Sequence, residues 1–313
     1  MSGKVVVVTG AGSGLGREHA LAFAARGARV VVNDFGAAVS GEHTGDRPAD
    51  EVVATIVANG GTAVANHASV ADWAGAESIV AGAVEAFGRL DVVVNNAGIN
   101  RPGSLAELTE LDIDAQLGVH LKGTLAVSHF AAVHWNAAGP APGRAIINTT
   151  SPVGLHPTAG GGVYGAAKAG IAAATISHAQ ELAPLGVRVN AVAPSARTRM
   201  VVDSPSVLAL MPESDGFDRH DPAHVSPLVV HLADDACRFT GRIFAIEGPD
   251  VAIYDPFGIS LHFSKETGWT PEALAAVFAD VDAQARVSAL FPGGVIGLSV
   301  PPGRTMRAVP PVP

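Results

Sequence analysis

The chain of 313 residues is long enough for one large α/β domain or two small ones. Hydrophobic residues make up 48% and charged residues only 16%, which suits a sheet buried on both faces. The formal net charge of −9 argues against a broad surface for nucleic acid or anionic membranes, and no apolar run is long enough to span a bilayer. The single cysteine, Cys237, rules out an internal disulfide framework, so we expect a cytoplasmic protein in which it is a buried small hydrophobe.

The first element is a short apolar run of β-branched residues, Lys4–Val8, which predicts a buried strand. It ends at the glycine-rich turn Thr9–Gly16, and a helical pattern follows from Glu18 to Ala25. Strand, glycine turn and helix, in this order, are the context that a dinucleotide-binding turn requires. Glycines let the backbone approach a pyrophosphate, and the helix N-terminus offers free N–H groups to it.

The next predicted strand, Ala28–Asn33, ends in Asp34, which lies 18 residues beyond Gly16. This is near the distance expected for a carboxylate that hydrogen-bonds the adenosine ribose. A carboxylate there repels a 2′-phosphate, so the sequence favours NAD over NADP. Arg17, beside the turn, is the counter-indication, because a cation there can neutralise such a phosphate; we interpret it as a solvated side chain.

Further apolar segments continue the alternation of strands and helices that a doubly wound sheet requires. We expect these strands at Leu90–Val94, Arg144–Asn148, Val187–Ala193 and Arg242–Ile246. The pattern predicts an α/β fold with a doubly wound, Rossmann-type parallel sheet in a single domain of residues 1–255. Residues 256–313 are expected to form a C-terminal extension, with a helix over 270–286 and an extended proline-rich tail.

Tyr164 and Lys168 are four residues apart in a segment that the Ala-rich run after them predicts to be helical. Side chains at i and i+4 share a helix face, about 5–6 Å apart at Cβ, so the ammonium can lie beside the phenol. Tyrosine titrates near pH 10, and a base near neutrality needs a pKa lower by about 2 units, which a neighbouring cation supplies. With Ser151, thirteen residues upstream, the pair is able to take a proton from an alcohol. The alternative is a solvated surface pair.

Five separated signals share one order and spacing: T-G-A-G-S-G-L-G at 9–16, Asp34, N-N-A-G at 95–98, Ser151, and Tyr164 with Lys168. With these signals the sequence resembles the short-chain dehydrogenase/reductase family over about residues 3 to 250. The resemblance implies that Tyr164 is the acid/base and that Ser151 hydrogen-bonds the substrate oxygen. It also implies that Lys168 binds nicotinamide ribose hydroxyls while lowering the pKa of Tyr164.

The resemblance further implies a catalytic set and a cofactor site. The catalytic set is Ser151, Tyr164, Lys168 and His120, and the cofactor-binding residues are Gly10, Ser13, Gly14, Leu15, Gly16, Asp34, Ser69, Val70, Asn96, Ala97, Gly98, Tyr164, Lys168, Pro194 and Thr198. Ser69 replaces an aspartate that commonly meets the adenine, and Pro194-Ser195 replaces Pro-Gly in a loop that is one residue shorter. His120 replaces the asparagine of a proton relay; it is either part of that relay or a core histidine bonded to a backbone carbonyl.

A narrower set of segments marks one branch: V-V-V-N-D at 30–34, the long loop from Phe35 to Ala49, G-G-T-A-V-A-N at 60–66, V-H-L-K-G at 119–123, A-P-S-A-R-T-R-M at 193–200 and T-P-E-A at 270–273. The sequence is similar there to the (3R)-hydroxyacyl-CoA dehydrogenase unit of peroxisomal multifunctional enzyme type 2, also called a 17β-hydroxysteroid dehydrogenase, and its bacterial single-domain relatives. This implies NAD-dependent oxidation of a (3R)-3-hydroxyacyl-CoA in lipid or sterol catabolism. It also implies a homodimer or homotetramer built through long helices that begin near residues 115 and 164.

Residues 200–222 are rich in turn formers and predict a mobile lid over the cleft. Its apolar residues form either a wall for a lipid-like substrate or a short helix packed on the core; they are Val201, Val202, Leu208, Leu210 and Met211. The candidates for binding CoA phosphates are Arg101, Arg197, Arg199 and Arg219. Two other functions stay open: a dehydrogenase for free hydroxysteroid or terpenoid alcohols, and a non-catalytic NAD(H)-binding sensor. The twelve histidines show no metal-site spacing, so no metal is expected.

Overall fold

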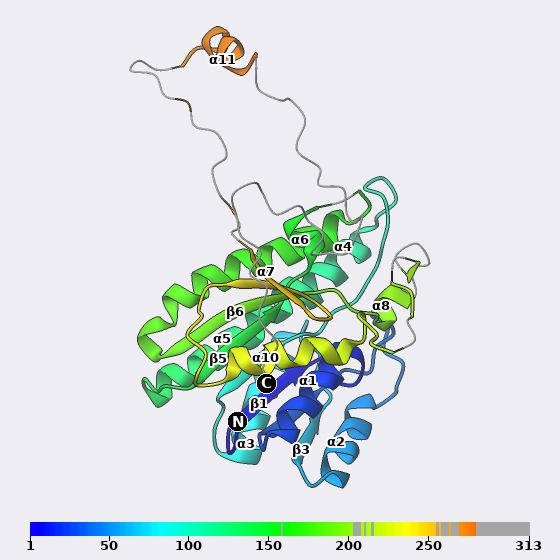
Figure 1. Cartoon of the computed structure of the whole chain (residues 1–313), viewed down its shortest axis with the longest axis vertical. Helices are drawn as coiled ribbons and strands as arrows, with labels where there is room; N and C mark the ends of the chain where they lie inside the picture. Colours follow the sequence, from blue (N-terminus) through cyan, green and yellow to red (C-terminus); the bar gives the residue numbers. More distant parts are fainter. Residues whose placement is uncertain are drawn as a thin grey trace.

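The computed structural model describes residues 1–157, 159–202, 208–209, 211–213, 216–254, 257, 263 and 269–279. Its centre is a single eight-stranded sheet in the order β3-β2-β1-β4-β5-β6-β7-β8 (Figure 1). The strands are β1 (Val5–Thr9), β2 (Arg29–Asn33), β3 (Thr62–Asn66), β4 (Val92–Asn95), β5 (Arg144–Thr149), β6 (Val187–Pro194), β7 (Ile243–Glu247) and β8 (Asp250–Tyr254). The order reverses between β1 and β4, so the predicted doubly wound, Rossmann-type sheet is confirmed.

The sheet departs from the parallel arrangement at one edge. The strands from β1 to β7 pair in parallel, but β8 runs antiparallel to β7, with Ile243 opposite Tyr254 and Glu247 opposite Asp250. Only two residues, the first of them Gly248 with φ 53°, connect these strands. A parallel neighbour needs a crossover of a dozen or more residues, so such a short connection produces a hairpin.

Alternate residues of β1 enter two different cores, which explains its continuous apolar sequence. Val6 and Val8 pack in the core beneath α1 (Gly14–Ala25), α2 (Pro48–Ala58) and α10 (Ser226–Ala233). Val5 and Val7 pack in the opposite core, beneath α3 (Trp73–Phe87) and α5 (Gly123–Ala138). The sheet is thus covered on both faces, as its low charge content predicted (Figure 1).

A polar network replaces apolar packing near the carboxyl ends of β4 and β5. The Asn95 amide donates to Ser128 of α5 and to Asn148, at 2.9 Å each. The Asn148 amide in turn donates to Thr175 of α7 (Gly162–Glu181), also at 2.9 Å. These bonds attach α5 and α7 to the same face of the sheet, at the end where the candidate site lies.

The helix expected near residue 115 is interrupted. It consists of α4 (Glu110–Leu117), a π-helical turn η1 (Gly118–Lys122) and then α5. A π-helical turn carries an extra residue and is frequent at functional sites. His120 lies on this turn and is only 1% exposed.

The remaining described elements are short. They are α6 (Pro152–Leu155), η2 (Ala183–Leu185), α8 (Arg199–Val202), η3 (Pro222–Val225) and α11 (Pro271–Phe278). Thr270 caps α11 by accepting a hydrogen bond from the Ala273 N–H, as the sequence predicted, and Figure 1 draws this helix apart from the sheet. The rest of the helix predicted over 270–286 and the proline-rich tail lie outside the described residues. No helix in the described part is long and apolar enough to cross a membrane.

Candidate active site

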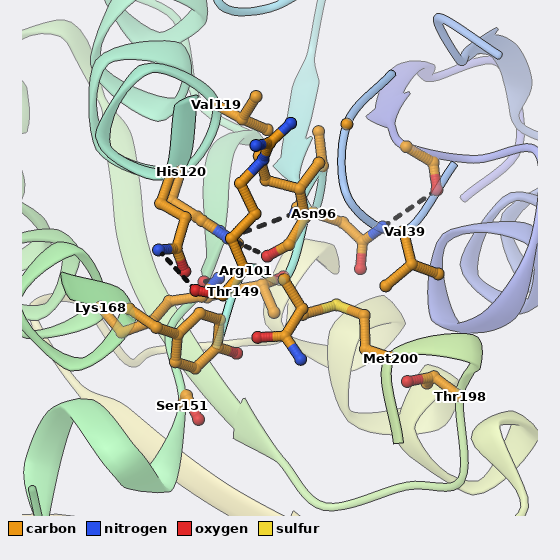
Figure 2. A pocket seen from close by; sticks show the side chains of 18 of the residues that line it. Val39, Asn96, Arg101, Val119, His120, Thr149, Ser151, Lys168, Thr198 and Met200 are labelled. Carbon is orange, nitrogen blue, oxygen red and sulfur yellow. Dashed lines mark hydrogen bonds between the residues drawn. The ribbon is translucent and has the colours of Figure 1, made fainter. Parts of the chain in front are cut away.

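A cavity of about 740 Å³ opens at the carboxyl ends of the central strands. All but one of the predicted site residues line it: Ser151, Tyr164, Lys168, His120, Gly10, Ser13, Gly14, Leu15, Asp34, Ser69, Val70, Asn96, Ala97, Gly98, Pro194 and Thr198. Figure 2 shows Lys168 and Ser151 on one side of this cavity, across from Thr198 and Met200. Parallel strands end at one edge of a sheet, so the topology gathers these distant segments.

The exception is Gly16, which supports the turn from beneath. A Cβ at this position would lie 2.1 Å from the Gly10 carbonyl oxygen, so only glycine lets α1 begin this close to β1. The turn itself needs glycines with positive φ, 62° at Gly10 and 52° at Gly14. The Asn96 amide fixes its start by donating to the Thr9 and Gly10 carbonyls at 3.0 and 3.1 Å. The N-terminus of α1 therefore faces the cavity in the geometry that binds a phosphate.

Asp34 lies where the sequence predicted a ribose-binding carboxylate. It is 8% exposed, and its two oxygens accept hydrogen bonds from the Gly12 and Gly36 N–H groups at 2.8 Å each. These bonds hold a negative charge beside the glycine turn and leave the carboxylate on the cavity surface. Arg17 pairs with Glu18 at 2.6 Å, so its charge is already neutralised by a neighbour.

Ser151, Tyr164 and Lys168 meet where the end of β5 approaches α7. Lys168 is 3% exposed; its Nζ lies 5.6 Å from the centre of the Tyr164 ring and donates to the Thr149 carbonyl at 2.7 Å. Burial lowers the pKa of Lys168 to about 7. The predicted helix face is therefore correct, and the alternative of a solvated surface pair is excluded.

The expected depression of the Tyr164 pKa was wrong. Burial raises the pKa of Tyr164, and a hydrogen bond with Ser151 only partly offsets that rise. The physical reason is that desolvation penalises an isolated phenolate, while the buried lysine also tends to lose its charge.

His120 makes the backbone contact expected of a core histidine, and the relay role stays a prediction. Its Nε2 lies 2.7 Å from the Ile99 carbonyl oxygen, the contact expected of a core histidine, which makes Nε2 the protonated nitrogen. Its Nδ1 is buried without a partner among the described residues, and its ring meets that of Tyr164 edge-on at 5.1 Å. Burial, assisted by the Lys168 charge, lowers the pKa of His120 to about 3, so the imidazole is neutral at physiological pH.

The structure adds site residues that motif spacing did not indicate. The hydroxyls of Thr149 and Ser195 are buried without a partner among the described residues, and both residues line the cavity. Unpaired buried hydroxyls fit a cavity that receives a polar ligand such as a dinucleotide. The only hint of these additional site residues in the sequence was Ser195, which stands in place of the usual Gly.

Gly154 acts differently: a Cβ there would lie 2.7 Å from Lys168 and Ala169, so glycine permits α6 to approach α7.

Three of the four arginines proposed for CoA phosphates already bind carboxylates, and their proposed role stays a prediction. Arg101 pairs with Glu42 and Asp112, Arg197 with Asp218, and Arg219 with Glu247 and Asp250. Arg199 is exposed at the cavity and has no ion-pair partner among the described residues. Of the apolar lid residues, Val201 and Met211 line the cavity and Leu208 does not, while the Val202 side chain and Leu210 lie outside the described part.

The comparisons with known proteins agree with this geometry. The short chain dehydrogenase family matches residues 4–206. Hydroxyacyl-CoA dehydrogenase ChsB1 of Mycobacterium tuberculosis is 39% identical over 289 residues, covering 90% of this chain and 89% of that protein. Peroxisomal multifunctional enzyme type 2 of Mus musculus is 41% identical over 244 residues, covering 78% of this chain but 31% of the mouse enzyme. A short chain dehydrogenase structure from Mycobacterium avium matches with a TM-score of 0.78 and 45% identity, covering 89% of this chain and 94% of that one.

The chain therefore belongs to the short-chain dehydrogenase family, as its motifs predicted. It is an oxidoreductase that acts on CH–OH groups with a nicotinamide cofactor. The comparisons leave the type of cofactor open: a related structure from Burkholderia cenocepacia, with 33% identity and a TM-score of 0.69, is a complex with NADP. That match covers 79% of this chain and 97% of the other.

Gly154→Ala tests whether the approach of α6 to α7 sets the catalytic geometry. The added methyl must push Ser151 away from Tyr164, so we expect kcat to fall by about 10²-fold, the effect of misplacing a reacting group by about 1 Å. Gly162→Ala is the matched control, since it lies at the start of α7 with no atom within 4 Å of an added Cβ. Steady-state kinetics gives kcat for both variants, and thermal melting shows whether each variant is folded. Unchanged kcat in a folded Gly154→Ala protein would show that this contact is dispensable.

Proposed function

We propose that the protein is an NAD-dependent (3R)-3-hydroxyacyl-CoA dehydrogenase that oxidises a secondary alcohol to a ketone. The observation that carries the proposal is the convergence of Ser151, Tyr164 and Lys168 in one cavity that also holds the glycine turn and Asp34. The Mycobacterium tuberculosis relative supports the substrate class, because that protein is named a hydroxyacyl-CoA dehydrogenase and the match covers 89% of it.

The chain supplies acid/base chemistry at the carbinol. Ser151 donates a hydrogen bond to the carbinol oxygen and orients it toward Tyr164. The Tyr164 phenolate accepts the hydroxyl proton as the C–H bond breaks. A dinucleotide bound along the glycine turn and Asp34 would supply the acceptor for the hydride that leaves the carbinol carbon. Lys168 stabilises the phenolate, since opposite charges attract strongly in a site that excludes water.

His120 takes a positioning role in this proposal. Its edge-on contact fixes the Tyr164 ring, and its Nε2–H bond to Ile99 fixes its own ring and leaves Nδ1 as an acceptor. Gly98 is part of the same arrangement, because a Cβ there would lie 2.6 Å from the His120 ring. A neutral imidazole beside Lys168 avoids a second positive charge next to the ammonium.

Asp34 supports NAD over NADP as the cofactor. Its carboxylate is held by two backbone N–H groups at the cavity end that the glycine turn forms. A ribose 2′-hydroxyl can donate to such a group, whereas a 2′-phosphate is repelled by it. Arg17 does not offset this repulsion, because Glu18 is its partner.

The cavity supports a lipid-like acyl chain with an anionic head. Val201 and Met211 provide an apolar wall, and Arg199 offers a cation at the same cavity. A free hydroxysteroid or terpenoid alcohol is the second candidate, because the same wall and catalytic groups serve it without the CoA contacts. A non-catalytic NAD(H) sensor has no need of Ser151, Tyr164 and Lys168 together.

We also propose a homodimer or homotetramer in the cytoplasm. The outer surfaces of α5 and α7 carry small or apolar exposed residues, including Val133, Ala166 and Ala173. Both helices cover the same face of the sheet, so a second copy can pack on them together.

Tyr164→Phe tests the proposed base. The change removes the phenolic oxygen and keeps the ring, so we expect kcat to fall by about 10²–10⁴-fold while NADH binding, followed by fluorescence, stays close to wild type. Tyr254→Phe is the matched control, because Tyr254 is the other tyrosine and does not line the cavity. Retained turnover in Tyr164→Phe would reject the assignment of Tyr164 as the base.

Steady-state kinetics on a (3R)-3-hydroxyacyl-CoA and on its free alcohol analogue, each with NAD⁺ and NADP⁺, tests substrate and cofactor together. We expect the highest kcat/KM for the CoA thioester with NAD⁺, because Arg199 can reach a phosphate and Asp34 repels one at the ribose. Equal values for the two alcohols would favour the free-alcohol dehydrogenase. A preference for NADP⁺ would refute the role given to Asp34.

Analytical ultracentrifugation of the intact chain tests the assembly. We expect a mass at least twice the 31.6 kDa of one chain, and a lower mass for Val133→Glu, which places a charge on the proposed interface. A wild-type protein that sediments as a monomer at micromolar concentration would contradict the proposal.

A further inference from the structure

Two segments far apart in the sequence form adjoining walls of the cavity. The first is the loop 36–46, which follows Asp34 and places Ala37, Ala38, Val39 and Gly41 on the cavity surface. The second is the segment 99–108, which follows Gly98 and leads to α4; residues 99–103 and Leu108 line the cavity. The first wall thus follows the predicted ribose-binding carboxylate, and the second begins beside His120, whose Nε2 contacts the Ile99 carbonyl.

The loop 36–46 is closed on itself. The Thr44 N–H donates to the Gly36 carbonyl at 2.9 Å, and Ala37 pairs with His43 in an isolated antiparallel bridge. Gly36 has φ 71°, and a Cβ there would lie 2.1 Å from the Asp46 carbonyl oxygen. A loop tied at its base in this way moves as a unit, so a displacement at its tip reaches whatever the tip contacts.

Arg101 joins this loop to the second wall and to α4. Its Nε donates to the Ser40 carbonyl at 2.6 Å, its Nη2 to Glu42 at 2.8 Å, and its Nη1 to Asp112 at 3.0 Å. The side chain is only 16% exposed, so these bonds are shielded from much of the solvent. A backbone bond of 2.8 Å from the Asn100 N–H to the Val39 carbonyl runs beside it.

Both ends of this connection are anchored. Asp112 belongs to the capping box of α4, in which the Thr109 hydroxyl donates to its carboxylate at 2.6 Å. Hydrogen bonds from Thr109, with a contribution from Arg101, lower the pKa of Asp112 to about 2, so this partner stays charged. The Arg101 carbonyl itself accepts a hydrogen bond from Gln116 at 3.1 Å.

We propose that Arg101 is a positioning residue that couples the dinucleotide half of the cavity to the segment 99–108. A ligand that contacts the loop 36–46 reduces the motion of that loop. Through its hydrogen bonds, the Arg101 guanidinium then reduces the motion of residues 99–108 and of the start of α4. Substrate then meets a wall that the cofactor has already ordered, and by linkage substrate tightens cofactor binding to the same extent. This inference rests on the nicotinamide cofactor of the family and is independent of the identity of the alcohol.

An arginine is required because its planar fork presents donors in three directions, toward Ser40, Glu42 and Asp112. A lysine carries one compact charge and reaches only part of this set. Arg101→Lys should therefore keep the fold and the charge and lose most of the coupling, and Arg101→Leu should lose all of it.

Hydrogen–deuterium exchange with ADP-ribose as the probe tests the proposal, because this ligand fills the adenosine end without a nicotinamide ring. In the wild-type protein we expect saturating ADP-ribose to slow exchange about fivefold or more in peptides covering 99–108, the lower end of typical coupling between sites. Peptides covering the glycine turn at 10–16 report direct binding. In Arg101→Leu and Arg101→Lys the turn should still be protected and the 99–108 segment should not.

Arg89→Leu is the matched control, since Arg89 also bonds a carboxylate, Asp91 at 2.6 Å, but lies at the opposite end of β4, outside the cavity lining. It should behave as wild type. Protection of 99–108 that survives in both Arg101 variants would overturn the proposal, as would its absence in wild type or a failure of ADP-ribose to bind. If Arg101→Leu does not fold, Arg101→Lys and Glu42→Gln carry the test.

Discussion

The contact of α6 with α7 at Gly154 is the constraint on which the catalytic geometry depends. Backbone atoms of Lys168 and Ala169 occupy the space where a side chain at residue 154 would lie. Two hydrogen bonds also tie the end of β5 to α7: the Thr150 hydroxyl donates to the Lys168 carbonyl at 2.6 Å, and the Lys168 ammonium donates to the Thr149 carbonyl at 2.7 Å. Each of the two elements, the end of β5 and the middle of α7, thereby donates one hydrogen bond to the other. Together these bonds hold Ser151 close to Tyr164.

Burial shifts the pKa values of the site residues and also strengthens the electrostatic interactions between them. Desolvation raises the pKa of Tyr164 and lowers those of Lys168 and His120, so burial disfavours the charged form of each group. The same exclusion of water strengthens the attraction between a phenolate and an ammonium once the proton is in place. A neutral His120 is useful here, because a charged imidazole would compete with Lys168. The site is thus arranged to stabilise a Tyr164 phenolate beside a charged Lys168 when substrate and cofactor are bound.

The arginines of the chain show how an acidic protein uses its few cations. The chain has 29 acidic and only 20 basic residues, and five of its arginines pair with carboxylates in the described part. Arg219 pairs with Glu247 of β7 and Asp250 of β8, outside the cavity lining. Arg101 and Arg197 instead hold segments that line the cavity, and Arg197 also binds the carbonyls of Met211 and Pro212. These bonds shape the walls of the cavity, a role for which the donor geometry of arginine is suited.

The sequence by itself determined the doubly wound sheet and most of the named residues that line the cavity, because both are encoded locally. Runs such as Val5–Val8 specify buried strands, the glycine turn specifies its own backbone, and the i, i+4 spacing places Tyr164 and Lys168 on one helix face. Three-dimensional packing decided the rest. The rise in the Tyr164 pKa, the free Nδ1 of His120 and the partners of Arg101 depend on desolvation and on contacts between residues many positions apart, which no local pattern carries. The antiparallel direction of β8 follows from its two-residue connection to β7, and this connection can be recognised only once both strands are known.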